Sequence, residues 1–113
     1  VADSISVSMP RDGEAAVKAL NESKGVAIAV SDEEILNAIP ALARATGIFA
    51  EPAAAATYAG LLKAREQKLF GKNEKITLLL TGNGLKDINS AMKTAGSLIQ
   101  IENDIMALDN IKW

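Results

Sequence analysis

The sequence has no cysteine and no histidine, and only four of its 113 residues are aromatic. Without cysteine, disulfides, thiolate catalysis and cysteine-based zinc sites are excluded. Without histidine, Ser-His-Asp chemistry and most transition-metal sites are excluded as well. The two absences together remove thiol chemistry, Ser-His-Asp chemistry and most transition-metal sites from the candidate functions.

A strong charge of either sign and a long apolar run are also missing. The net charge is −2 and acidic and basic residues are interspersed, so with few aromatic residues there is little support for nucleic-acid binding. No apolar run approaches the roughly 20 residues that span a bilayer, and the first residues carry no signal-peptide pattern. We therefore expect a single globular domain over residues 1–113, with a cytoplasmic location as the default.

Two short apolar runs predict the sheet of this domain. Val26–Val30 and Ile76–Leu80 show no alternation with polar residues and are bounded by turn residues. Runs of this kind are typical of strands buried on both faces of a parallel sheet. An extended stretch at 4–8 and a helix at 14–21 precede the first run, which predicts a right-handed βαβ unit. The predicted fold class is α/β, with two or three mostly parallel strands flanked by helices.

Capping residues predict where two longer helices begin and end. Ser31 followed by Glu34 forms a capping-box pattern for a helix that ends at Gly47. Pro40 lies inside this helix and predicts a kink or a brief break. Pro52 suits the first position of the next helix, where its missing donor costs nothing.

The remaining helices carry weaker signals. Gly60 and the alanines of the Pro52 helix predict close packing against a neighbour or a ligand. Asp87 is a cap for a short helix at 88–93. Asp104 is a cap for a last helix at 105–111, with Trp113 as a terminal anchor.

The rest of the chain is arranged around the stretch ITLLLTGNGLKD at 76–87. The glycines and the asparagine of Thr81-Gly82-Asn83-Gly84 permit positive φ and a close approach of a ligand to the backbone. Ligands of open parallel sheets bind beyond the carboxyl ends of the strands, so the Thr81 hydroxyl is expected to face a bound small molecule. The loop lacks the third glycine of a dinucleotide fingerprint and the Gly-Lys-Ser/Thr of a P-loop. A purely structural turn is the alternative interpretation.

Three segments resemble the fold-type-II pyridoxal-phosphate enzymes, in particular the threonine synthase family. ADSI at 2–5 resembles the ADSI or ADGI segment of that family. GIFAEPAAAATYAGL at 47–61 resembles its G-[IV]-F-x-E-P-A-[SG]-A-A-x-x-A-G-[LV] segment, with Ala54 in place of Ser or Gly. TGNGLKD at 81–87 is similar to the threonine synthase loop and differs from the Ser-Gly-Gly-Asn loop of threonine and serine dehydratases. The resemblance covers residues 1–95.

The resemblance implies a cofactor, a substrate and a set of site residues. The cofactor is pyridoxal phosphate, and the reaction converts O-phosphohomoserine and water to threonine and phosphate. The Thr81 hydroxyl is expected to hydrogen-bond the pyridine nitrogen, a neutral partner that leaves this nitrogen largely unprotonated. Glu51 is expected close to the cofactor ring, and Gly82 and Asn83 are expected to shape the loop around it. Lys86 is interpreted as structural or solvated.

Two parts of that family's machinery are not found in the sequence, namely the Schiff-base lysine and the glycine-rich phosphate loop. We therefore expect no catalytic residue in the chain, which is interpreted as a carboxyl-terminal fragment that is inactive alone. We also expect homo-oligomers, and self-association through apolar surface or strand edges that have lost their neighbours. Two alternatives stay open, which are a fragment of a dehydratase of the same fold and a stand-alone, non-catalytic binding module.

Overall fold

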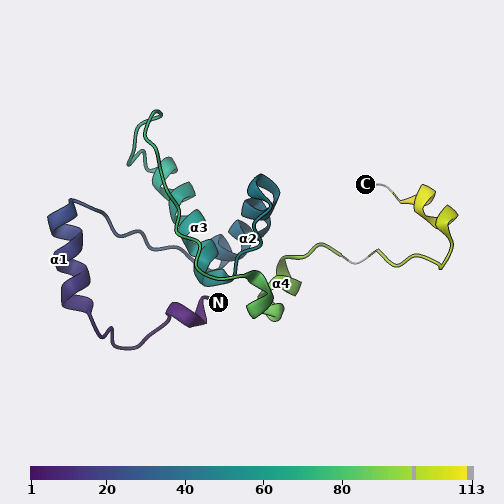
Figure 1. Ribbon diagram of the computed structural model, residues 1–113, viewed down its shortest axis with the longest axis horizontal. Coiled ribbons are helices and arrows are strands. Elements are labelled where there is room, and N and C mark those ends of the chain that lie inside the picture. Colours follow the sequence, from purple (N-terminus) through teal and green to yellow (C-terminus); the bar gives the residue numbers. More distant parts are fainter. Residues whose placement is uncertain (98, 112–113) are drawn as a thin grey trace.

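A computed structural model describes residues 1–97 and 99–111. Within these residues the chain forms α-helices and short 3-10 helices, in the order η1 (Asp3–Ile5), α1 (Gly13–Ser23), α2 (Asp32–Thr46), α3 (Pro52–Glu66), η2 (Gly84–Lys86), α4 (Ile88–Thr94) and η3 (Ile105–Asn110) (Figure 1). The molecule extends over 61 × 36 × 19 Å. Its radius of gyration is 18.1 Å, compared with about 13 Å for a compact domain of this length. Much of the chain therefore lies outside any common core.

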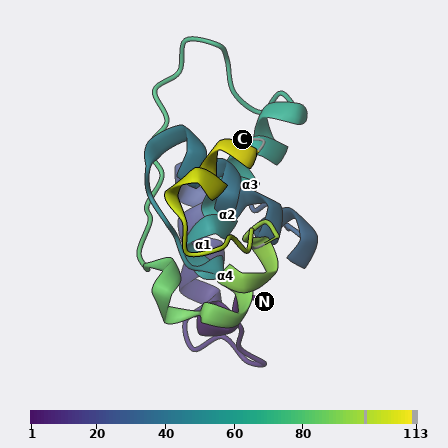
Figure 2. The same ribbon diagram turned by 90° about the vertical axis from the view of Figure 1, so that its right-hand side faces the viewer.

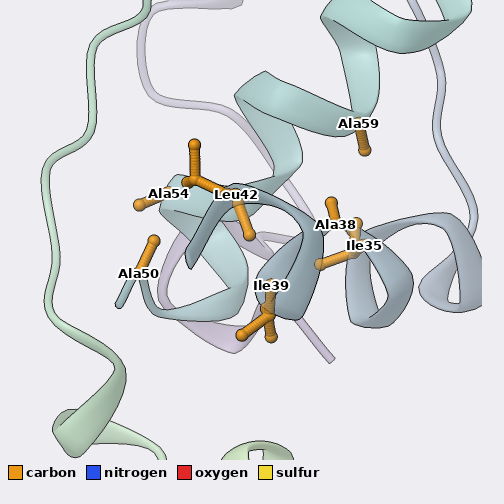
Figure 3. Packing of buried hydrophobic residues seen from close by; sticks show 8 residues of the cluster. Ile35, Ala38, Ile39, Leu42, Ala50, Ala54 and Ala59 are labelled. Carbon is orange, nitrogen blue, oxygen red and sulfur yellow. The ribbon is translucent and has the colours of Figure 1, made fainter. Parts of the chain in front are cut away.

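The core lies between α2 and α3. Helix α2 has helical spacing of its apolar residues and buries Ile35, Ala38, Ile39 and Leu42 on one face. Helix α3 and the residue pair before it meet that face with small side chains, which allow a close approach of the two backbones (Figure 3). These side chains are Ala50, Ala54, Ala55 and Ala59. The large side chains on α2 and the small ones on α3 explain why the two helices pack as a pair.

Both helices begin as their capping residues predict. The Ser31 hydroxyl accepts a hydrogen bond from the Glu34 amide at 3.1 Å, and the Ser31 amide donates to the Glu34 carboxylate at 2.6 Å. This reciprocal capping box satisfies two backbone donors at the start of α2. Gly47 ends the helix in the left-handed region at φ 76°, which favours glycine. Pro52 occupies the first turn of α3, as predicted.

The interior of these helices differs from the prediction at two positions. A break at Pro40 does not occur, since helix α2 continues through the proline to Thr46 with buried core residues on both sides of it. Gly60 does not mark a close approach, since a Cβ built there meets nothing within 4 Å. The alanines of α3, by contrast, are buried as predicted.

The predicted parallel strands do not form among the described residues. The two apolar runs, Val26–Val30 and Ile76–Leu80, are extended segments without a ladder, and the stretch at 4–8 begins with η1. A strand needs a neighbour for its backbone groups, and neither run has one here. Only the carboxyl ends of the runs, at Val30 and Leu80, pack against the core. The expected α/β sheet is therefore replaced by a helical arrangement within residues 1–97 and 99–111.

Helix α1 and η3 lie away from the helix pair, whereas Val1 and Ala2 pack against the core. Helix α1 forms close to its predicted position, but it buries no residue and lies apart from α2 and α3 in Figure 1. The segment leading to η3 extends away on the opposite side, toward the viewer in Figure 2. The predicted last helix is the 3-10 helix η3, begun by the Asp104 carboxylate, which accepts from the Met106 amide at 3.0 Å. Trp113 lies outside the described residues.

None of the helices in the described part of the chain combines the length and the apolar character needed to cross a bilayer.

Candidate functional site

Two of the segments with family resemblance meet at an antiparallel bridge between Ala50 and Asn83. The Glu51 amide donates to the Gly82 carbonyl at 3.0 Å, and the Gly84 amide donates to the Phe49 carbonyl at 2.9 Å. Ala50 is completely buried at this point. The bridge therefore holds the chain before α3 against the loop that follows Ile76–Leu80.

Side chains pack against the two glycines that flank this bridge. A Cβ at position 82 would lie 2.6 Å from Cγ of Glu51 and closer still to its carboxylate. A Cβ at position 84 would lie 2.6 Å from Cδ2 of Phe49 and closer still to the far edge of the ring. Both separations are shorter than Cβ atoms normally show, so a larger residue at either position would displace the Glu51 or the Phe49 side chain. The reason is close approach alone, because neither glycine has positive φ; the sequence had also indicated positive φ.

The carboxylate of Glu51 is buried in this contact. The residue is only 8 % exposed, and its Oε2 atom lies 3.3 Å from Nζ of Lys86, which is largely exposed. Glu51 occupies the position before the first residue of α3, where the helix dipole favours a negative charge. Its side chain does not cap the helix. It is free instead to contact the loop at Gly82 and the Lys86 ammonium group.

Two side chains of the loop accept hydrogen bonds from nearby backbone amides, one within the loop and one at the start of α4. Asn83 Oδ1 accepts a hydrogen bond from the Leu85 amide at 2.9 Å, and Asp87 Oδ1 accepts from the Ser90 amide at 3.0 Å. The second bond starts α4 as predicted. Hydrogen bonds from the Ser90 hydroxyl and amide lower the pKa of the Asp87 carboxyl, because they favour its charged form.

A cavity of about 240 Å³ lies where the three segments with family resemblance converge. The first segment contributes residues 2–4 together with the preceding Val1, the second contributes residues 51–53, and the third contributes Lys86 and Asp87. Three carboxylates, those of Asp3, Glu51 and Asp87, therefore line the cavity together with one lysine. Residues as far apart in the sequence as Val1 and Asp87 thus line one cavity.

A larger cavity, of about 660 Å³, lies between α2 and α3. A partly exposed ion pair borders it, with Lys63 Nζ at 3.0 Å from Glu34 Oε1. Ala59 of the second segment lines this cavity, but the first and third segments contribute nothing to it. The smaller cavity is the better candidate site, because residues of all three segments line it, among them three carboxylates and a lysine. The greater volume of the other cavity does not outweigh this.

The residues predicted for the site are not all in the cavity. Glu51 lines it, whereas Thr81, Gly82 and Asn83 do not. Thr81 is exposed and precedes the half-buried Gly82, and the Asn83 side chain is also exposed. The loop that carries Thr81 is nevertheless fixed directly on Glu51 through Gly82.

Phe49 and Asp3 were missed at this site, and Lys86 was treated only as structural or solvated. The signal for Phe49 was present in the sequence, since Phe49 and Glu51 are two positions apart, as are Gly82 and Gly84. Two bulky residues and two glycines at equal spacing match the side-chain period of paired extended segments. No comparable signal marks Asp3.

The donor groups of the site fit part of a pyridoxal-phosphate molecule. Three carboxylates against one ammonium group do not suit a phosphate dianion. An exposed hydroxyl at Thr81 suits a neutral ring nitrogen, since a hydroxyl both donates and accepts.

No group of acidic side chains in the described residues is arranged to hold a metal ion.

Comparison with known proteins shows to which family of proteins this chain belongs. The model of the family "pyridoxal-phosphate dependent enzyme" matches residues 1–82 of the chain. The chain belongs to this family of pyridoxal-phosphate-dependent enzymes.

The similar curated proteins are more specific. The threonine synthase of Mycobacterium leprae is 41% identical over 108 residues, which are 96% of this chain and 30% of the relative. That of Methanocaldococcus jannaschii is 40% identical over 111 residues, or 98% of this chain and 27% of the relative. That of Halalkalibacterium halodurans is 43% identical over 114 residues, or 99% and 32%. The chain thus spans about a third or less of the length of these relatives.

Proposed function

We propose that this chain forms the carboxyl-terminal part of a threonine synthase, which converts O-phosphohomoserine and water to threonine and phosphate. The observation that carries the proposal is the convergence of the three segments with family resemblance on one cavity. The name shared by the relatives supports it. The loop TGNGLKD at 81–87 also favours this reaction over that of a dehydratase.

In this proposal the chain provides the wall that faces the cofactor ring. Pyridoxal phosphate, when bound, supplies an electron sink for the substrate. The Thr81 hydroxyl holds the pyridine nitrogen as a neutral hydrogen-bond partner. Glu51 lies close to the ring and holds the loop through Gly82, and Asn83 sets the shape of the loop through its bond to the Leu85 amide.

The remaining parts of the site come from outside these 113 residues in this proposal. They are the lysine that binds the cofactor covalently and the loop that binds its phosphate. The exposed runs Val26–Val30 and Ile76–Leu80 then become strands of a mostly parallel sheet completed by the rest of the enzyme. The chain alone is inactive, and the complete enzyme is a cytoplasmic homo-oligomer.

The first experiment tests the role of Thr81 in the full-length protein encoded by the gene. Thr81→Val keeps the shape of the side chain and removes the hydroxyl, and Thr81→Ser keeps the hydroxyl. We expect Thr81→Val to shift the absorbance of the bound cofactor and to reduce threonine formation, whereas Thr81→Ser retains both. An unchanged spectrum and rate in Thr81→Val contradict the proposed role of this hydroxyl.

The substrate is tested in the same preparation. Phosphate release from O-phosphohomoserine, with threonine as the product, is expected. Formation of a 2-oxo acid from threonine or serine, without phosphate release, identifies a dehydratase instead.

The chain of 113 residues is tested separately. Pyridoxal phosphate is added, the mixture is reduced with borohydride, and the intact mass and absorbance are recorded. We expect no adduct beyond that of exposed lysines. A single adduct at one defined lysine, with a shifted absorbance band, means that the chain holds a complete cofactor site and overturns the proposed division of the enzyme.

A further inference from the structure

We propose that Glu51 is a positioning residue for Thr81, and that it acts through the volume of its buried side chain and not through its charge. The proposal rests on the proposed function, since it assigns the cofactor contact to the Thr81 hydroxyl. It adds a residue that sets the position of this hydroxyl without touching the cofactor nitrogen itself.

The first step of the argument is the contact between Glu51 and the residue next to Thr81. The side chain of Glu51 fills the space where position 82 would carry a Cβ. The Glu51 amide also binds the Gly82 carbonyl at 3.0 Å. The backbone immediately after Thr81 is therefore held by both the main chain and the side chain of a single residue.

The second step concerns the rigidity of Glu51 itself. Its carbonyl accepts the Ala55 amide at 2.8 Å, so the residue is joined to the first turn of α3. Helix α3 is held in turn by the core residues of α2. Glu51 thus connects the best-packed part of the molecule to the exposed loop that carries Thr81.

The third step separates volume from charge. The only ion pair of Glu51 within the described residues is with Lys86, whose side chain is 64% exposed. The Lys86 end of this pair lies in water, which weakens the attraction between the two charges. The packing against Gly82 involves a side chain that is only 10% exposed. Packing is therefore the larger effect, and a neutral residue of the same shape should preserve the position of the loop.

The experiment compares Glu51→Gln, Glu51→Ala and Lys86→Met in the full-length protein, with Glu66→Ala at the exposed far end of α3 as the control. Two quantities are measured. The first is the hydrogen-exchange protection of the Glu51 and Gly84 amides without cofactor. The second is the dissociation constant and absorbance spectrum of pyridoxal phosphate.

We expect Glu51→Ala to reduce the protection of both amides and to weaken cofactor binding by about tenfold or more, the loss that outer-shell partners of metal ligands typically show. Glu51→Gln and Lys86→Met should remain within about threefold, and Glu66→Ala should not differ from the unmodified protein. If Glu51→Gln is as damaging as Glu51→Ala, charge and not volume carries the role. If Glu51→Ala binds the cofactor normally with an unchanged spectrum, the positioning role is wrong.

A double variant keeps the test decisive if Glu51→Ala unfolds. Gly82→Ala alone should disrupt the loop, because its Cβ overlaps the Glu51 side chain. Glu51→Ala combined with Gly82→Ala places a methyl group in the space that the glutamate vacates. Cofactor binding and amide protection should then recover relative to Gly82→Ala alone, a non-additive result that only direct contact explains. Simple additivity overturns the proposal.

Thr81→Val in the same series distinguishes the two proposals. If Thr81→Val changes the spectrum and Glu51→Ala does not, only the positioning role of Glu51 fails. If Thr81→Val has no effect, the proposed function of the loop fails, whatever the hydrogen exchange shows for Glu51.

Discussion

The two halves of the stretch 76–87 have opposite environments, although they are continuous in sequence. In the first half, Ile76 is 44% and Leu79 is 75% exposed, and no residue pairs with a neighbouring strand. In the second half, Gly84 is buried and the backbone on both sides of Asn83 is hydrogen-bonded to the segment before α3. The loop finds its partner within the chain, whereas the apolar run does not. The candidate site is therefore built from contacts within the described residues, whereas the predicted sheet does not form among them.

The largest expected effect contrasts one leucine of the core with one of the exposed run. Leu42→Ala should destabilise the protein by about 2–5 kcal/mol, because it opens a cavity at a residue that is 2% exposed. Leu79→Ala removes the same atoms from an exposed position and should change the free energy of unfolding by less than about 0.5 kcal/mol. Urea unfolding measures both. Equal effects would mean that the run is buried in solution.

The next effect tests the fixed loop itself. Gly82→Ala should cost about 1–3 kcal/mol, as overpacking usually does, because a Cβ there overlaps the Glu51 side chain. Gly60→Ala is the matched control, since it adds the same atom to a helix position with open space. That variant should stabilise α3 by about 0.5–1 kcal/mol. A Gly82→Ala variant as stable as the control would contradict the close approach.

A third prediction concerns association through the exposed run. The isolated chain should self-associate at high concentration, because Ile76–Leu80 offers apolar side chains and unpaired backbone groups. Leu79→Lys should reduce this association with a change of less than about 0.5 kcal/mol in stability. Val17→Lys, at an exposed apolar position of α1, is the control and should have a smaller effect. Light scattering that shows a clean monomer of the unmodified chain would count against this prediction.

The smallest effect concerns the end of the fixed loop at low pH. The pKa of Asp87 is lowered from its ordinary value of 3.8, first of all by the Ser90 hydroxyl. A lowered pKa stabilises the folded state above the unfolded value, and this contribution is lost as the pH falls through the folded pKa. The start of α4 should therefore loosen only below about pH 3.8. Carboxyl titration by NMR checks this, and Ser90→Ala should return the pKa of Asp87 toward its ordinary value.

Local signals predicted the helix boundaries well. The capping box at Ser31, the terminal glycine at position 47 and the proline at the start of α3 all act within one helical turn, so the sequence around them contains all the information needed. Asp87 and Asp104 begin their short helices for the same reason. Membership of the pyridoxal-phosphate enzyme family was likewise read from short segments, and the family match confirms it.

Pairings between distant segments could not be predicted in the same way. The two apolar runs predicted strands that do not form among the described residues, because a strand also needs a neighbour, which the pattern of one segment does not specify. The contact of Glu51 with Gly82 joins residues that no local rule connects, and only the matched spacing of Phe49-Ala50-Glu51 and Gly82-Asn83-Gly84 marks it in retrospect. The role of Thr81 toward a cofactor stays a prediction.

The bridge between Ala50 and Asn83 also sets an order for folding. Its two residues are 33 positions apart and enclose α3, so closing this loop costs about 3 kcal/mol in chain entropy beyond a constant term. Helices α2 and α3 are joined by only a few residues and can pair at a much smaller entropic cost. The helix pair should thus form early and the loop should dock late. Thr81 should therefore reach its final position only after the core between α2 and α3 has formed. The site would then be completed in the last folding step.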